Sequence, residues 1–88
     1  MGYAFVVVGS ITTAARLKKT AEARGVYGGS VVHTPGVINQ GGCSYSLRIK
    51  EELMPRIELI AQQRGIRLKG IYVERIENGR RVYYAVFR

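Results

Sequence analysis

Cys43 is the residue best placed for covalent chemistry, because it ends a loop rich in glycine. The loop is too long for a tight hairpin and too rich in glycine for regular structure, and such loops tend to carry function. Gly41 and Gly42 allow backbone N–H groups to converge on whatever the sulfur holds. Pro35 and Gly36 predict a type II turn earlier in the loop. We therefore predict Cys43 as the catalytic residue, with Pro35, Gly41 and Gly42 among the binding residues.

A helix start near this loop would make the thiol more reactive. Ser10 offers a side-chain oxygen that can cap a helix, and the predicted topology brings this helix start to the sheet edge that carries Cys43. The N-terminus of a helix carries about half a positive charge, which lowers the pKa of a thiol from about 8.5 toward the physiological range. We therefore expect a partly ionised thiol at neutral pH, with Ser10 in the binding site. The alternative is an inert, buried cysteine, because free cysteines are among the most buried residues.

His33 precedes Cys43 by ten residues and is a candidate general base, as in Cys/His nucleophile pairs. The alternative is a histidine at a strand end that bonds only to backbone. A chain with one Cys and one His cannot build a four-ligand zinc site by itself, so we expect no metal. The glycines at 25, 28 and 29 lack the Lys and Ser or Thr of a phosphate-binding loop, so we predict no cofactor.

Length and composition indicate one globular domain over residues 1–88, with 47% hydrophobic and 23% charged residues. The longest apolar run is too short to span a membrane and is not preceded by basic residues, so neither a membrane partner nor a secretory signal is expected. A single cysteine favours a reducing compartment, and we predict a cytoplasmic location. The net charge of +8 favours a polyanionic partner such as nucleic acid or an acidic protein.

The first half of the chain predicts a strand, a helix and a second strand. Residues 3–8 form a short apolar run that is typical of a buried strand. A helix follows from Ser10 to Gly25, and its predicted apolar side contains Ile11, Ala14, Leu17 and Ala21. Residues 26–33 are rich in β-branched side chains and predict a second strand, in which Gly28 and Gly29 indicate a bulge or a close backbone approach.

The second half repeats this order and adds one strand. Tyr45, Leu47 and Ile49 alternate with Ser44, Ser46 and Arg48, which predicts a strand with one buried face. The following helix tolerates Pro55 in its first turn and ends at Gly65, and its predicted inner side contains Leu53, Ile57, Ile60, Ala61 and Arg64. Residues 66–76 and 81–87 predict a hairpin joined by a type I′ turn at Asn78 and Gly79.

The two halves resemble each other at an offset of forty residues, with the segment 21–26 echoed by 61–66. Two successive β-α-β units usually interleave with both helices on one sheet face, because crossovers are right-handed. We therefore predict an α+β fold, a ferredoxin-like β-α-β-β-α-β sandwich with an additional C-terminal strand.

The predicted last strand is apolar on both sides, with Tyr83 and Phe87 on one side and Tyr84 on the other. An uncovered apolar face is typical of an interface, so we predict a homodimer. The alternative is that these are single surface aromatics. The basic residues of the first helix are typical of a solvated face, or with Arg64 and Arg67 would attract an acidic partner.

The arrangement resembles the selenium/sulfur carrier-like family of small domains. The resembling segments are residues 31–35, Gly42 with Cys43, the helix end at Arg64 and Gly65, and residues 66–72. That family usually has arginine after the proline, glycine after the cysteine and often a second cysteine. This chain has Gly36 and Ser44 there and no second thiol, so an intramolecular redox cycle is doubtful.

The resemblance implies that Cys43 carries sulfur or selenium as a persulfide or selenenyl sulfide. It also implies a cysteine desulfurase-like donor or another sulfur carrier protein as partner. Carrier-type thiol chemistry is favoured over independent turnover as an enzyme. The alternative function is a non-catalytic regulatory module, or one that binds nucleic acid or an acidic partner. The third strand lacks the paired aromatics of RNA-recognition domains, which weakens the nucleic-acid alternative.

Overall fold

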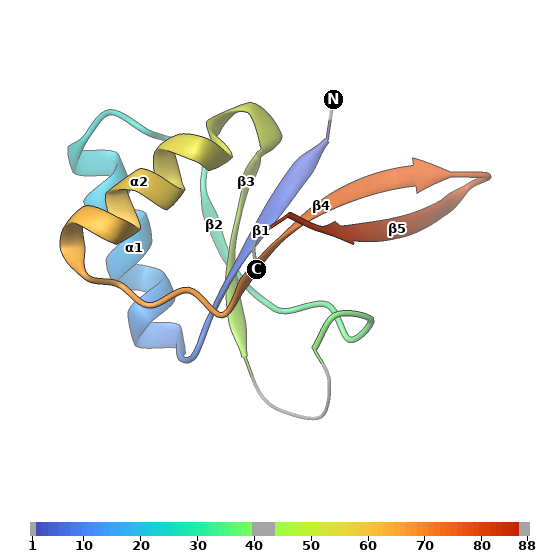
Figure 1. Ribbon diagram of the computed structural model, residues 1–88, viewed down its shortest axis with the longest axis horizontal. Helices are drawn as coiled ribbons and strands as arrows, with labels where there is room; N and C mark the ends of the chain where they lie inside the picture. Colours follow the sequence, from blue (N-terminus) through green and yellow to red (C-terminus); the bar gives the residue numbers. More distant parts are fainter. Residues whose placement is uncertain (1, 40–43, 87–88) are drawn as a thin grey trace.

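The fold is an antiparallel five-stranded sheet with two helices, seen in a computed structural model that describes residues 2–39 and 44–86 (Figure 1). The elements follow the order β-α-β-β-α-β-β, and the strand order in the sheet is β2-β3-β1-β4-β5. Their bounds are β1 Tyr3–Val8, α1 Ile11–Ala23, β2 Ser30–His33, β3 Tyr45–Lys50, the 3₁₀ turn η1 Glu51–Leu53, α2 Met54–Arg64, β4 Gly70–Glu77 and β5 Arg80–Ala85. The chain is therefore an α+β protein with an added C-terminal strand, as predicted.

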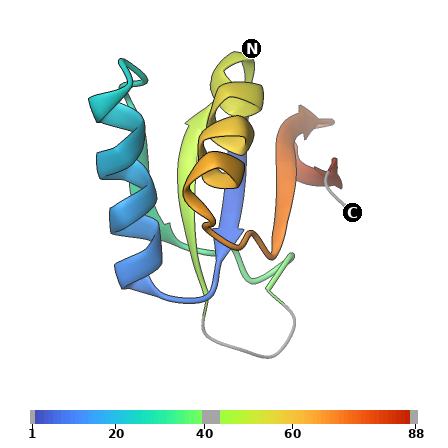
Figure 2. The same cartoon turned by 60° about the vertical axis from the view of Figure 1, so that its left-hand side comes forward.

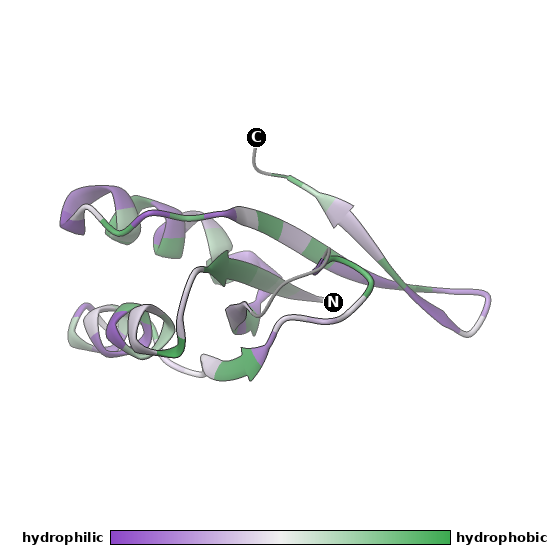
Figure 3. Cartoon of the chain, turned by 90° about the horizontal axis from the view of Figure 1, so that it is seen from below, coloured by the Kyte–Doolittle hydropathy of each residue, from purple (hydrophilic) through white to green (hydrophobic). Residues whose placement is uncertain are grey.

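Both helices lie on the same face of the sheet, as predicted (Figures 1 and 2). The core forms between the two layers, where Val6 of β1, Leu17 of α1, Leu47 of β3 and Ile57 of α2 are fully buried. β1 is hydrophobic along nearly its whole length, because it is the central strand and is covered on both faces (Figure 3). No helix within the described residues has the length and apolar character needed to cross a bilayer.

The two helices end with the same backbone geometry, which gives a structural basis to the forty-residue repeat. Gly25 and Gly65 both have positive φ, at 83° and 66°. The amide that follows each glycine donates to the carbonyl five residues earlier, Val26 to Ala21 and Ile66 to Ala61, each at 2.9 Å. This left-handed helix end favours glycine because no Cβ opposes the positive φ.

The predicted turn between the last two strands is confirmed. Asn78 and Gly79 both have positive φ, at 53° and 75°, as a type I′ turn requires at its two central residues. The position of Pro55 is also confirmed, because it lies in the first turn of α2.

The predicted bounds of three strands were wrong. The second strand begins at Ser30 and not at residue 26, because Gly28 has a φ of 93° that interrupts the extended backbone. The close approach predicted there is confirmed at Gly29, where a Cβ would lie 2.8 Å from Cδ1 of Leu47. The fourth strand begins at Gly70, because residues 66–69 form the connection from α2. The fifth strand begins at Arg80 and ends at Ala85, and residue 87 lies outside the described part.

Some predicted faces were also wrong. Ile11 and Arg64 were expected on inner helix sides, yet both are exposed, since they lie at helix ends that extend past the core. Ser44 and Ser46 were expected on a solvated side of β3, yet both are buried. The hydroxyl oxygens of Ser46 and Thr34 lie 2.7 Å apart, so the polar group is hydrogen-bonded where it is buried.

The sheet face opposite the helices is partly covered by the chain itself. Phe5 of β1 is only 4% exposed, and the Tyr83 ring meets it edge to face with centroids 5.7 Å apart. Tyr83 is therefore not a single surface aromatic. On the helix side of the sheet, Tyr84 of β5 and Val86, just after β5, remain 47% and 49% exposed. The homodimer stays a prediction. The exposed side chains of Tyr84 and Val86 are the apolar surface near β5 that could form its interface.

Candidate functional site

The ends of β1 and β2, the starts of β3 and β4, and the start of α1 lie together at one end of the sheet. In the register of the sheet, Val8 at the end of β1 lies opposite Tyr45 at the start of β3, and His33 at the end of β2 lies opposite Tyr45 from the other side. The backbone N–H of Lys69, just before β4, donates to the carbonyl of Val7 at 2.8 Å. We call this the strand-end edge, and it is where the predicted site residues were expected to meet.

Ser10 caps α1 at this edge, as predicted. Its φ of −153° and ψ of 161° are extended, and its Oγ accepts a hydrogen bond from the backbone N–H of Thr13 at 3.1 Å. The Ser10 and Thr13 hydroxyl oxygens are also 2.9 Å apart. The Ser10 hydroxyl therefore serves the helix itself, and any part it takes in a binding site is secondary to capping.

His33 lies exposed on β2 at the strand-end edge, with its ring against Tyr45. The ring centroids are 4.6 Å apart and the planes are tilted by 35°. Because Tyr45 follows Cys43 by two residues, His33 lies opposite the strand that the cysteine precedes. The general-base role of His33 stays a prediction.

The loop after β2 starts with a compact turn that differs from the predicted one. Ile38 and Asn39 both donate their backbone N–H to the carbonyl of Pro35, at 3.0 Å each. A type II turn with Pro35 in its second position would require a positive φ at Gly36, and Gly36 does not have one. The predicted type II turn is therefore wrong, because the chain turns one residue later with Pro35 as the acceptor.

Two contacts hold the described ends of this loop together. The backbone N–H of Thr34 donates to the carbonyl of Ser44 at 3.1 Å. The Ser44 hydroxyl donates to the side-chain carbonyl oxygen of Asn39 at 3.2 Å. The segment between Asn39 and Ser44 contains Gly41, Gly42 and Cys43, and these three predicted site residues lie outside the described part of the chain.

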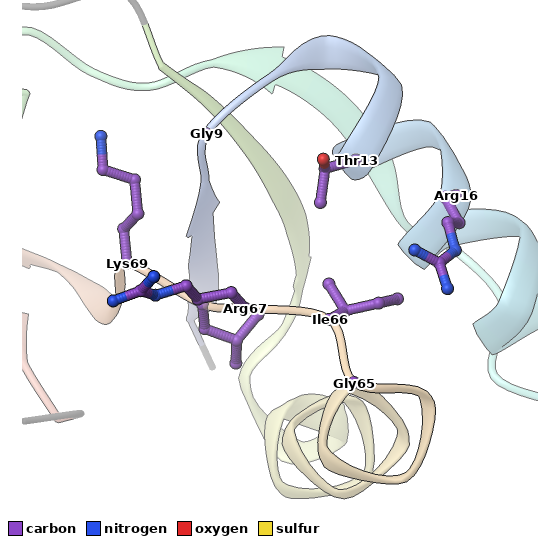
Figure 4. Close-up of a pocket in the computed structure, with 8 residues that line it drawn as sticks. Gly9, Thr13, Arg16, Gly65, Ile66, Arg67 and Lys69 are labelled. Atoms are coloured by element: carbon purple, nitrogen blue, oxygen red, sulfur yellow. The ribbon is translucent and has the colours of Figure 1, made fainter.

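A cleft of about 730 Å³ opens next to the strand-end edge (Figure 4). It lies between the first turns of α1 and residues 65–69, which connect α2 to β4. Thr13 and Arg16 project from the helix toward the connection, and Ile66 projects back toward the helix. Arg67 and Lys69 stand farther along the connection, toward β1. We call this hollow the edge cleft.

The edge cleft is positively charged. Arg16, Arg67 and Lys69 contribute three cationic side chains to its lining, and no carboxylate of the described residues lines it. Within residues 2–39 and 44–86, none of these three cations forms a salt bridge. Such a site can stabilise a negatively charged group without first breaking an internal ion pair.

The sequence predicted only part of this cleft. Arg16 and Arg67 were recognised as basic residues, whereas Lys69 was missed. The signal that would have found it is the alternation of Arg67 and Lys69 with the more buried Ile66 and Leu68 in the connection to β4. Among the described residues, no three His, Cys, Asp or Glu side chains gather into a cluster that could hold a metal ion.

A second charged cluster lies at the opposite end of the sheet. Arg75 donates from its two terminal guanidinium nitrogens to the two carboxylate oxygens of Glu51, at 2.6 and 2.7 Å. These hydrogen bonds lower the pKa of the Glu51 carboxyl below its usual value. Nearby, burial and a hydrogen bond of 2.9 Å from its hydroxyl to Glu74 raise the pKa of Tyr83. This cluster is internally paired, whereas the edge cleft is not.

Comparison with known proteins gives a single family. A search of curated proteins found no match, and neither did a search of solved structures. The family model described as "Putative Se/S carrier protein-like" matches residues 3–73. This match spans β1, both helices and the start of β4, and so contains the strand-end edge and the edge cleft. The chain belongs to the Putative Se/S carrier protein-like family.

Proposed function

We propose that this protein is a sulfur or selenium carrier that holds a persulfide or selenenyl sulfide on Cys43. The observation that supports this most is the family match over residues 3–73, which includes the chain's single cysteine. A carrier needs one nucleophilic sulfur and no bound metal. Cys43 is the only thiol that this chain offers for the purpose.

The transfer step follows ordinary thiol–disulfide chemistry. The Cys43 thiolate attacks the outer sulfur of a persulfide on the donor protein. A new S–S bond forms at Cys43, the S–S bond of the donor breaks, and the donor cysteine leaves as a thiolate. No oxidant or reductant is needed, because the cargo sulfur keeps its oxidation state. Repeating the step with Cys43 as donor passes the cargo to an acceptor.

The charge at the strand-end edge supports this chemistry. Ser44 follows Cys43 in the chain, and its carbonyl is bonded to the Thr34 amide at this edge. The edge cleft adds the cations of Arg67 and Lys69 on the segment bonded to Val7. Positive charge lowers the pKa of a nearby thiol and favours the anionic outer sulfur of a persulfide. We further propose that Gly41 and Gly42 supply backbone amides to this anion.

The sequence departs from the family pattern in having no second cysteine. This departure favours a role as a cargo carrier and disfavours redox cycling within the chain. Without a second cysteine, the chain cannot close an intramolecular disulfide that would release the cargo. Release then depends on an acceptor thiol from another protein. We propose a cysteine desulfurase-like protein or another sulfur carrier as the donor.

We also propose that β1 to β4 form a ferredoxin-like unit. The strand order β2-β3-β1-β4 supports this assignment, together with the two helices on one face. β5 then extends the sheet beyond the unit and leaves an edge for the proposed homodimer. The nucleic-acid alternative has less support, because Phe5 of the central strand is covered by Tyr83, and Tyr3 of the same strand already has the Arg48 guanidinium over its ring, 3.7 Å from the centroid.

Sulfur loading tests the proposed function. The full chain is incubated with a cysteine desulfurase and cysteine, and its intact mass is measured with and without a thiol reductant. We expect a mass gain of one sulfur atom that the reductant removes, and no gain in Cys43→Ser. An unchanged mass, under conditions in which a known sulfur acceptor is loaded, would contradict the proposal. Selenocysteine in place of cysteine tests the selenium cargo in the same way.

A further inference from the structure

A second hollow continues from the edge cleft along the outer side of α1. It has a volume of about 410 Å³ and lies between α1 and the end of α2. Its lining residues are Ala15, Arg16, Lys19, Thr20, Ala23 and Arg64. Arg16 lines both hollows, and Arg64 precedes Gly65 of the edge cleft. We call the two together the basic groove.

In the part of the chain that the structure describes, the basic groove is lined by cations and by no carboxylate. Its five charged side chains are those of Arg16, Lys19, Arg64, Arg67 and Lys69. In the described ranges none of them takes part in a salt bridge. This local excess accounts for a large share of the net charge of +8. An anionic partner would therefore gain attraction here without displacing internal ion pairs.

The nearest acidic residue on α1 does not neutralise the groove. Glu22 is bound to Lys18 at 2.8 Å, and neither residue lines the groove. Glu22 lies three residues after Lys19 on α1, but it pairs with Lys18, and within the described residues Lys19 itself forms no salt bridge. The Lys19 charge is therefore not paired directly, although Glu22 lies close to it on the helix.

The shape and lining favour a polypeptide over nucleic acid. Among the described residues no aromatic side chain lines the groove, so the described lining offers bases no stacking surface. Along α1 the side chains between the cations are small, namely Ala15, Thr20 and Ala23, and small side chains let another helix approach closely. Arg16 and Lys19 are spaced three apart, which matches carboxylates spaced three or four apart on a facing helix.

We propose that the basic groove docks an acidic α-helical segment of a partner protein. The docked segment lies along α1 beside the end of α2, with its carboxylates facing Arg16, Lys19 and Arg64. α1 has 13 residues and so presents about 20 Å of surface, which about fourteen helical residues would cover. This inference does not depend on Cys43 carrying sulfur or selenium.

Charge-matched variants of the whole 88-residue chain test the groove. The probe is a fluorescein-labelled helical peptide of about fourteen residues with glutamates spaced three and four apart, and binding is followed by fluorescence anisotropy at low ionic strength. The groove variant combines Arg16→Gln, Lys19→Gln and Arg64→Gln. The control combines Lys50→Gln, Arg80→Gln and Arg81→Gln, which remove the same charge from exposed positions outside the groove.

We expect the groove variant to bind the peptide about tenfold more weakly, which corresponds to about 1.4 kcal/mol. The control should change affinity by less than about twofold, since its charges lie beyond the peptide. Equal weakening in both variants would mean attraction by net charge alone and would overturn the proposal. So would the absence of binding to the unaltered protein.

Two further measurements complete the test. A single-stranded RNA with the same charge as the peptide is titrated in parallel. If the RNA binds more tightly than the peptide, and only the groove variant loses this binding, the groove is a nucleic-acid site and the proposal is wrong. Lys19→Glu alone should weaken peptide binding more than Lys19→Gln, because it places a carboxylate against the partner's carboxylates. This single exposed change keeps the proposal testable if the triple variant does not fold.

Discussion

The buried hydroxyl pair of Thr34 and Ser46 anchors the loop that leads toward Cys43, and removing one partner should cost more than removing both. The two oxygens lie 2.7 Å apart, and the residues are 6% and 0% exposed. In Ser46→Ala the Thr34 hydroxyl loses this partner in a place that water reaches poorly. A buried hydroxyl without a partner costs about 1–3 kcal/mol, whereas replacing both hydroxyls with apolar groups is nearly neutral.

We therefore expect Ser46→Ala and Thr34→Val each to lower the free energy of unfolding by about 1–2 kcal/mol. For a chain of this size that corresponds to a fall in melting temperature of about 4–16 °C. The double variant should lose no more than either single variant, so that the double-mutant cycle gives a coupling of at least about 1–2 kcal/mol. Ser30→Ala, at an exposed position on β2, is the control and should change stability by less than about 0.5 kcal/mol.

Urea unfolding of the unaltered protein and the four variants, followed by circular dichroism, measures these free energies. Additive losses in the double variant would refute the reasoning, because they would show that the two hydroxyls do not depend on each other. Losses in the single variants no larger than that of Ser30→Ala would also refute it.

Two further predictions concern the backbone and the titration of the opposite end of the sheet. Gly65→Ala should lower the free energy of unfolding by about 1 kcal/mol, because φ at Gly65 is 66°. Gly36→Ala is the control: Gly36 has open space and no positive φ, so the change should be neutral or slightly stabilising. Equal losses of the two variants in urea unfolding would contradict this prediction. Tyr83 should titrate above a free tyrosine, because burial and the hydrogen bond to Glu74 raise its pKa. The stabilisation by this group is fully present below the unfolded pKa and is lost as pH rises through the folded pKa. Glu74→Gln should lower the Tyr83 pKa in an ultraviolet titration, and an unchanged pKa would contradict the assignment.

Local patterns predicted the elements, and the errors came from contacts that are distant in sequence. The cap at Ser10, the glycine end of α2 at Gly65 and the turn at Asn78 depend on neighbouring residues, and all three are confirmed. The burial of Ser46 depends on Thr34 of another strand, so alternation along β3 alone predicted the wrong environment. Ile66 is apolar because it fills the core after α2, and the sequence presented it as part of a strand.

The candidate site, like the fold, could be predicted only where it depends on the order of the elements. The strand-end edge followed from the order of elements, because antiparallel neighbours bring β1, β2 and β3 to one edge there. The edge cleft could not be predicted from the order of elements, because it lies between the start of α1 and the connection after α2, which are about fifty residues apart. Only the folded chain brings Arg16 and Lys69 to the same hollow.

The ionisation of the Cys43 thiol is the most direct test of the proposed carrier chemistry. The rate of alkylation by iodoacetamide is measured against pH in the native protein, with Cys43→Ser as the blank and a cysteine peptide as the reference. We predict a midpoint below the free-thiol pKa of about 8.5 and a rate near neutral pH above that of the peptide. A midpoint at or above the peptide value, or no alkylation of the native protein, would contradict the proposed function.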